Sequence, residues 1–247
     1  MKRPKKIKEP NFSNNSYHYY RKSLQKVVKT VEKKALKMPL KRFDNTIALQ
    51  NSLYALIDDL INVVKSTFGS FKLLPVLNKW TKSISTHHAR KFDSKVKKYK
   101  DIEVSIKDSI NTSVKDEVIK RIAYNVSLIK TVEEDLKAKL RNDLTKLILD
   151  GRGENVKDIV KNRIGQSHRR LKIIAHDQTL KLSKAITVEK SKALGAKEFI
   201  YRTSLDEKVR KSHRDANGKT YSLEKSRGLD LQLDVNCRCT KEILFNF

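Results

Sequence analysis

The chain has 247 residues, of which 38% are hydrophobic and 34% are charged, and its mean hydropathy is -0.61. Its seven glycines and four prolines disfavour a sandwich or barrel with many tight turns, and no apolar run approaches the ~20 residues that cross a bilayer. Lysine and arginine exceed acidic residues by 55 to 28, and the formal net charge of +27 favours a polyanionic partner such as nucleic acid over a generic solubility charge.

Residues 1–16 are basic and contain little that could be buried, so they are predicted to form a disordered tail. Apolar residues then recur at helical spacing, which predicts helices over residues 17–39, 44–69 and 75–99. These helices make up an N-terminal helical region that spans residues 17–112.

Lysines are concentrated in the second half of the third predicted helix. We expect them to form a nucleic-acid-binding face, with a solvated basic face as the alternative. The candidate residues are Lys91, Lys95, Lys97 and Lys98. Two adjacent histidines, His87 and His88, do not share a helix face, so they are expected to be exposed polar residues and not a metal-binding pair.

Residues 113–195 form a second predicted helical region. The sequence T-V-E-E at 131–134 reads as a capping box and predicts a boundary between two helices. After the break at 150–153, Gly165 is expected to end a short helix, and a long helix is expected to follow from His168 to Leu194.

Asp177 and Gln178 stand among apolar residues in this last helix. A charge at such a position requires a partner, so Asp177 is predicted to be a buried polar latch that pairs with Arg202, Arg210 or another basic group of the C-terminal segment. A catalytic acid is the alternative.

The character of the chain changes after Gly195. The stretch E-F-I-Y-R-T at 198–203 and the stretch T-K-E-I-L-F-N-F at 240–247 read as strands, and Asn217-Gly218 is a strong signal for a hairpin turn. The predicted fold class is therefore mainly α, an elongated multi-helix body with a small C-terminal α+β domain, hairpin included, over residues 196–247.

Several motifs in one order resemble a known family. They are N-V-S-L-I-K-T-V from Asn125, I-I-A-H-D-Q-T at 173–179, the stretch 193–213, D-A-N-G-K-T-Y-S at 215–222 and N-C-R-C-T at 236–240. Over roughly residues 115–245 the chain resembles the phage Mu F-like family of head morphogenesis, or minor head, proteins. The resemblance implies a virion protein of the phage head interior, assembled in the host bacterial cytoplasm. Its expected partners are the portal protein, capsid or scaffold proteins, and packaged DNA, with no membrane partner.

The resemblance also assigns roles to particular positions. Its structural motif falls on Asp177, Gln178, Asp206, Gly218, Asn236 and Arg238. Relatives commonly carry a cysteine pair where this chain has Arg210 and His213, and interchange of cysteine and histidine is typical of a zinc site. The implied ligands are His213, Cys237 and Cys239, with Asp234 or Asp206 as the fourth.

Two other interpretations of the cysteines stay open. They are the only two in the chain and cannot build a disulfide framework, which suits a reducing cytoplasm. Reduced, buried thiols with Arg238 clasping Asp206 or Asp234 would need no metal, and redox chemistry would be expected from C-x-x-C, not from this C-x-C spacing.

No enzymatic activity is expected. The sequence has no phosphate-binding G-x-x-x-x-G-K-[ST], no H-E-x-x-H and no G-x-S-x-G. The alternative to a head protein is a zinc-stabilised basic module that binds nucleic acid.

Overall fold

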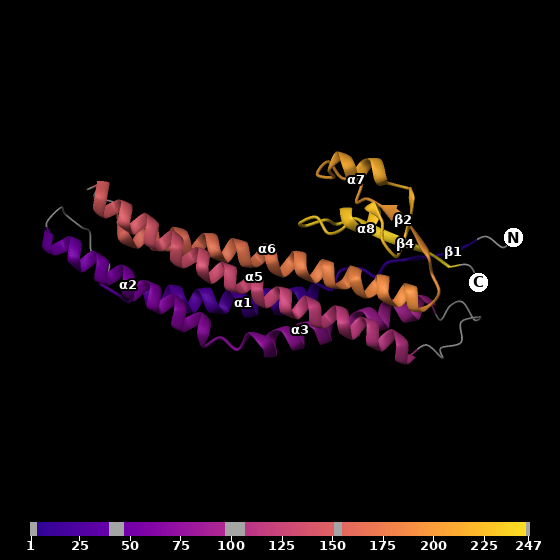
Figure 1. Ribbon diagram of the computed structural model, residues 1–247, viewed down its shortest axis with the longest axis horizontal. Helices are drawn as coiled ribbons and strands as arrows, with labels where there is room; N and C mark the ends of the chain where they lie inside the picture. The colour runs from indigo at the N-terminus through magenta and orange to yellow at the C-terminus, as the bar shows by residue number, and fades with distance from the viewer. Residues whose placement is uncertain (1–3, 40–46, 97–106, 151–154, 246–247) are drawn as a thin grey trace. The chain divides into compact units, whose positions relative to one another are not determined.

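The structure is a computed structural model that describes residues 4–39, 47–96, 107–150 and 155–245 (Figure 1). It is mainly helical with one small antiparallel sheet, which confirms the predicted fold class. The chain divides into two compact units that each combine distant segments. The first unit comprises Met1–His18, Asn78–Ala123 and His176–Phe247, and the second comprises Tyr19–Leu77 and Tyr124–Ala175. This division cuts across the sequence-based ranges 17–112 and 113–195.

The second unit is built from helices. Its segments belong to α1 (Asn14–Ala35), α2 (Ile47–Gly69), the first turn of α3 (Leu73–His88), α5 (Lys107–Asp150) and α6 (Val156–Ala193). Leucines and β-branched residues at helical spacing fill its core, among them Leu24, Leu60, Leu140 and Val160. The Tyr20 hydroxyl donates to Asn125 Oδ1 at 2.8 Å inside this core, and burial raises the pKa of Tyr20.

Two predicted helix ends are wrong. Helix α5 is 44 residues long and includes the T-V-E-E sequence without a break. The Thr131 hydroxyl donates to the Leu128 carbonyl and does not cap a new helix. Helix α6 likewise continues through Gly165 for 38 residues. In both places buried apolar residues lie on each side of the local signal, so tertiary packing overrides it.

The first unit contains a four-stranded sheet in the order β1-β4-β2-β3, with every pair antiparallel. The strands are β1 (Lys5–Lys8), β2 (Glu198–Arg202), β3 (Thr220–Ser222) and β4 (Thr240–Phe245). A cross-strand row joins Ile7, Ile243, Phe199 and Tyr221. This row belongs to a hydrophobic core that also includes Val188 of α6, so the sheet packs on that helix.

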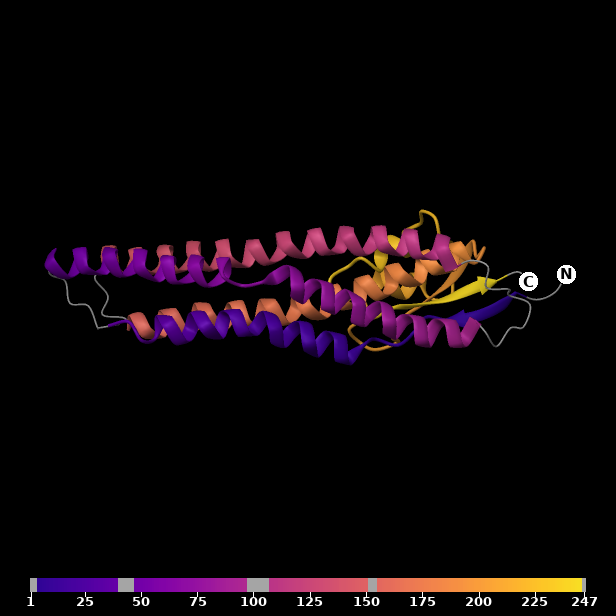
Figure 2. The ribbon, with the colours of Figure 1, turned by 90° about the horizontal axis from the view of Figure 1, so that it is seen from below.

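The prediction of a disordered tail is wrong for the residues that form β1. Strand β1 pairs with β4, and Figure 2 shows the two strands side by side. Only Ile7 of the strand is buried, so the sequence K-K-I-K carries almost no strand pattern of its own. Pairing with a distant strand creates this element, and local composition could not reveal it.

The third predicted helix is divided into three parts. Helix α3 ends at His88, a π-helical turn η1 covers Ala89–Asp93, and α4 covers Ser94–Val96. His88 is fully buried and its Nε2 lies 2.8 Å from the Thr187 hydroxyl, so its expected exposure is wrong. Burial, followed by the charge of Lys190, lowers the pKa of His88 to about 3, and the ring is therefore held neutral.

Asn217-Gly218 does not form a tight hairpin turn. Helix α7 (Lys211–Ala216) lies between β2 and β3, and the Lys219 N–H donates to the Ala216 carbonyl at 3.1 Å. Asn217 has φ -60° and ψ 131° and Gly218 has φ +79°, which is the geometry of a type II turn. Gly218 satisfies the positive φ, but the turn joins a helix to a strand.

No single helix in the described ranges is long and apolar enough to cross a membrane, and residues 51–69 with 73–96 meet that test only as a bent pair.

Candidate metal centre

The side chain of His213 meets those of the two cysteines, which lie more than twenty residues later in the sequence. One ligand atom each of His213, Cys237 and Cys239 lies within 4.8 Å of the others, and all three residues are buried. His213 Nδ1 is 3.4 Å from Cys239 Sγ and 3.7 Å from Cys237 Sγ. The two thiols come from the segment just before β4, and the imidazole comes from the first turn of the short helix α7.

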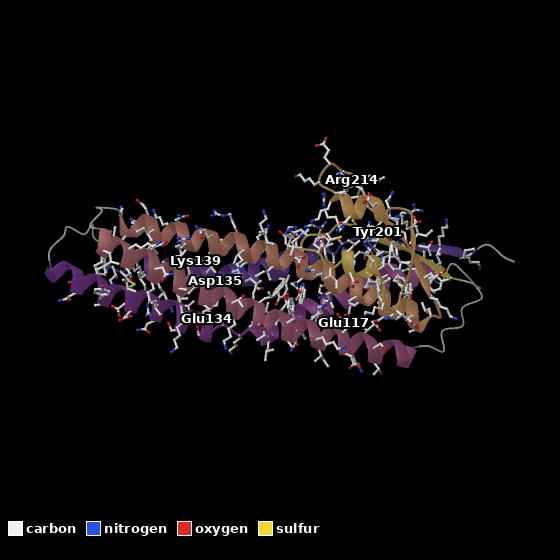
Figure 3. All side chains as sticks on the ribbon, turned by 45° about the horizontal axis from the view of Figure 1, so that its top comes forward. Glu117, Glu134, Asp135, Lys139, Tyr201 and Arg214 are labelled. Atoms are coloured by element: carbon white, nitrogen blue, oxygen red, sulfur yellow. The ribbon has the colours of Figure 1, made fainter. Side chains whose placement is uncertain are left out.

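Tyr201 of β2 is a fourth side chain that contacts this cluster. Its hydroxyl lies 2.9 Å from His213 Nδ1, and burial together with the adjacent thiols raises its pKa. Figure 3 labels Tyr201 on the sheet and Arg214 on α7, the elements that bring the phenol and the imidazole together. Tyr201 lies within the motif at 193–213, but the sequence assigned it no role at the cluster, because that role depends on the packing of α7 against β2.

Asp234 contacts the other face of the histidine. Its Oδ2 is 2.9 Å from His213 Nε2 and 3.4 Å from Arg210 Nη1. The carboxylate holds the proton on Nε2 and leaves Nδ1 directed at the thiols. Asp234 thus orients the imidazole from the side away from the thiols, as second-shell carboxylates do in zinc proteins.

The pKa values of the two thiols are shifted in opposite directions. A hydrogen bond from Cys239 lowers the pKa of Cys237 to about 5, and the charges of Lys184 and His213 act in the same direction. The same hydrogen bond, with burial, raises the pKa of Cys239. The hydrogen bond between the two thiols therefore favours ionisation at Cys237 over Cys239.

Buried charges near Cys237 support this assignment. Lys184 is 7% exposed and its ammonium donates to the Cys237 carbonyl at 2.6 Å. Lys241 is 1% exposed and pairs with the buried Glu9 at 3.4 Å. With Glu9 engaged by Lys241, the positive charge of Lys184 remains close to Cys237 and favours the ionised form of its thiol.

The donor set fits three positions of a zinc site. Two cysteine sulfurs and one imidazole nitrogen are the ligands that Zn²⁺ prefers, and a carboxylate already orients the imidazole. Asp206 is occupied by Arg238 at 2.7 Å, whereas the Tyr201 oxygen faces the cluster. A cavity of about 430 Å³ borders Cys239.

A polar latch positions the N-C-R-C segment. Asp177 Oδ1 accepts the Asn236 N–H at 2.8 Å, where the backbone has a φ of +57°. The other oxygen of Asp177 binds Lys181 at 2.8 Å and the Gln178 amide at 3.0 Å. The latch holds a left-handed residue directly before the first cysteine, so it sets the direction in which that thiol points.

The partners expected for Asp177 are engaged elsewhere. Arg202 pairs with Glu242 of β4 at 2.8 Å. Arg210 pairs with Asp234 and also donates to the Val235 carbonyl. Asp177 instead uses a lysine one turn away on its own helix and a backbone N–H, neither of which the sequence could single out.

Arg238 and Asp206 form the clasp that the metal-free interpretation requires. Their contact is 2.7 Å, and a Ser204 hydrogen bond with the Arg238 charge lowers the pKa of Asp206. The clasp ties the N-C-R-C segment to the loop after β2. The clasp is compatible with a bound metal, because Arg238 contacts Asp206 and neither of the two thiols that flank it in sequence takes part.

The order Asp234, His213, Cys239 also resembles the orienter, base and nucleophile of a cysteine enzyme. The sequence did not indicate this order, because Asp234 was expected to be either a metal ligand or a partner of Arg238. Two observations argue against catalysis: Cys239 is 3% exposed, and the Tyr201 hydroxyl occupies the same imidazole nitrogen.

The lysines predicted to bind nucleic acid are only partly described. Lys91 lies exposed on η1, and Lys95 lies half-buried on α4. Lys97 and Lys98 lie outside the described residues.

One family model matches the part of the chain that contains this site. The model of the family described as phage Mu protein F like protein matches residues 138–242. The matched stretch contains all of α6, strands β2 and β3, and the His213, Cys237 and Cys239 cluster. The resemblance to the phage Mu F-like family that the motifs indicate is thereby confirmed over these residues. No curated protein and no solved structure matches the chain.

Proposed function

We propose that the chain is a phage minor head protein that acts in head morphogenesis. The observation that carries this proposal is the family match, which includes the cysteine and histidine cluster and the sheet around it. The role is structural: the matched residues build a small module, and polar contacts of Asp177 and of Arg238 hold its loops in place.

The proposal places the protein at the portal vertex, inside the head and close to packaged DNA. The net charge of +27 supports this location, because a protein among densely packed phosphates benefits from positive charge. Assembly in the host cytoplasm agrees with two reduced, buried cysteines.

We further propose that the cluster binds zinc in this module. Zinc would be held by His213, Cys237 and Cys239, with Asp234 orienting the imidazole. The metal would supply cross-linking between α7 and the segment before β4, two short elements with few buried apolar residues of their own.

Co-purification with the portal protein encoded by the same genome tests the head assignment. The tagged chain and the portal are expressed together and captured at several salt concentrations. A tagged basic protein of similar net charge is the matched control, because +27 alone can retain an acidic partner. Retention of the portal by this chain alone supports the proposal, and no co-assembly at any salt concentration contradicts it.

A second candidate function is a zinc-stabilised basic module that binds nucleic acid outside the particle. The charge and the cluster both favour it. It predicts tight duplex binding that falls steeply with salt, together with stoichiometric zinc and no retention of the portal. The portal and duplex measurements therefore separate the two candidates.

A further inference from the structure

Strand β1 brings lysines into contact with the region that follows α3. Lys6 and Lys8 are exposed on the face of β1 opposite the buried Ile7. The Lys95 ammonium donates to the Lys8 carbonyl at 2.8 Å, so α4 lies along this edge strand. Residues separated by 87 positions in sequence thus share one surface.

Buried side chains hold both elements in place. Ile7 of β1, Phe92 of η1 and Val96 of α4 belong to the same hydrophobic core. The π-helical turn buries Phe92 while Lys91, its neighbour in sequence, remains exposed. The lysines are therefore presented by backbone that is already ordered, which lowers the entropy lost when a ligand binds.

The described carboxylates nearest this surface, Glu9 and Asp93, are paired with other lysines. Burial, and then the charge of Lys8, lowers the pKa of Lys95; Glu9 acts in the opposite direction and Lys91 adds to the lowering. Asp93 is engaged by Lys190 at 3.0 Å, and Glu9 is buried against Lys241. Among the residues that the structure describes, Lys8 and Lys91 have no ion-pair partner, and Lys95 bonds to a neutral carbonyl.

We propose that Lys6, Lys8, Lys91 and Lys95 form a preorganised surface that binds the phosphate backbone of double-stranded DNA. An anion placed among these ammonium groups would relieve their mutual repulsion, and lysine point charges would contact phosphates without reading sequence. This surface deepens the proposed function, because it rests on the protein lying near packaged DNA. It adds β1 to the lysines that the sequence had indicated on the third helix.

Fluorescence anisotropy with a short DNA duplex of arbitrary sequence tests the surface. The full chain and a K6Q/K8Q/K91Q/K95Q variant are compared over a range of salt concentrations. A matched control, K197Q/K208Q/K211Q/K219Q, removes the same charge from exposed positions elsewhere in the same unit. A variant with arginine at the four proposed positions keeps the charge, and melting curves verify that each variant folds.

The slope of log affinity against log salt should become shallower by about 0.9 for each phosphate contact that is lost. This change is expected in the glutamine variant of the proposed surface but not in the matched control or in the arginine variant. Equal losses in the two glutamine variants would overturn the proposed surface while leaving DNA proximity intact. Failure of the unaltered chain to bind DNA at low salt would reject both the surface and the DNA part of the proposed function.

Discussion

At the scale of single residues, His213 is fixed by a different group on each ring nitrogen. Asp234 lies at Nε2, whereas the Tyr201 hydroxyl and both thiols lie around Nδ1. The geometry places the imidazole and the Cys237 thiol, whose pKa is lowered, together inside the protein, and the ammonium of Lys184 bonds to the Cys237 carbonyl. This arrangement is the one that a thiolate-binding cation stabilises most.

Replacing Asp234 with Asn should weaken zinc binding by roughly 10- to 100-fold, because the imidazole would lose the carboxylate that orients it. Cys237→Ser should remove zinc altogether, since it removes a ligand. Zinc per chain, measured by elemental analysis, and competition with a chromogenic chelator check both expectations. Asp230→Asn, a change at an exposed carboxylate of α8 (Arg227–Leu231), is the matched control. Unchanged affinity in the Asp234→Asn variant would contradict the orienting role.

His88 should make the protein less stable in mild acid. Its pKa is about 3 in the folded protein because burial, and then Lys190, disfavour the charged ring, whereas it is ~6.5 in an unfolded chain. The unfolded chain therefore binds more protons between these values, so this contribution to stability is complete above pH ~6.5 and is lost as pH falls toward 3. Between pH 7 and pH 5 the loss amounts to about 2 kcal/mol.

Urea unfolding at pH 7 and pH 5 measures this loss. A His88→Asn variant lacks the titrating ring, so its stability should fall by less over the same interval. The same fall in both proteins would show that other groups produce the pH dependence.

At the scale of elements, tertiary packing overrides the local sequence signals for where helices and strands begin and end. Periodicity correctly predicted the helices that became α1 and α2, because apolar stripes are a property of local sequence. The signals at Thr131 and Gly165 did not end their helices, because buried residues continue on both sides. Strand β1 was missed because it depends on β4, more than two hundred residues away.

Gly165 offers a direct test of this competition. Its φ is helical, and an added Cβ would lie 3.9 Å from the Arg169 side chain, so Gly165→Ala should stabilise the protein by about 1 kcal/mol. Gly228→Ala should destabilise it by about 1 to 3 kcal/mol, because the Cβ would come within 2.6 Å of the Tyr221 ring. Chemical unfolding of both variants measures the two signs. Destabilisation by Gly165→Ala would mean that Gly165 is required for a reason other than local helix structure.

At the scale of the whole molecule, segments from the beginning, middle and end of the sequence form one unit. The buried pair of Glu9 and Lys241 joins β1 to β4 beneath the sheet, and burial lowers the pKa of Lys241 to about 8. The family motifs predicted the cysteine cluster, since they lie in the matched residues. They did not predict the contributions of Glu9, Lys184 or Tyr201, which arise only when the segments meet.

Glu9→Gln should destabilise the protein by about 3 kcal/mol, because it leaves the Lys241 charge buried without its carboxylate. The double change Glu9→Gln with Lys241→Met should recover much of this loss, since it removes the charge itself. Thermal and chemical unfolding of the two variants provide the comparison. If the double variant is no more stable than Glu9→Gln alone, the buried pair is not the source of the effect.

Mass spectrometry of purified phage heads tests the central claim most directly. Heads are collected from cells in which the genome that encodes this chain directs particle assembly, and their proteins are quantified against the portal protein. A minor head protein is predicted to be present in the washed particles in few copies per portal ring. Its absence from heads, although the chain is produced in the same cells, would contradict the assignment.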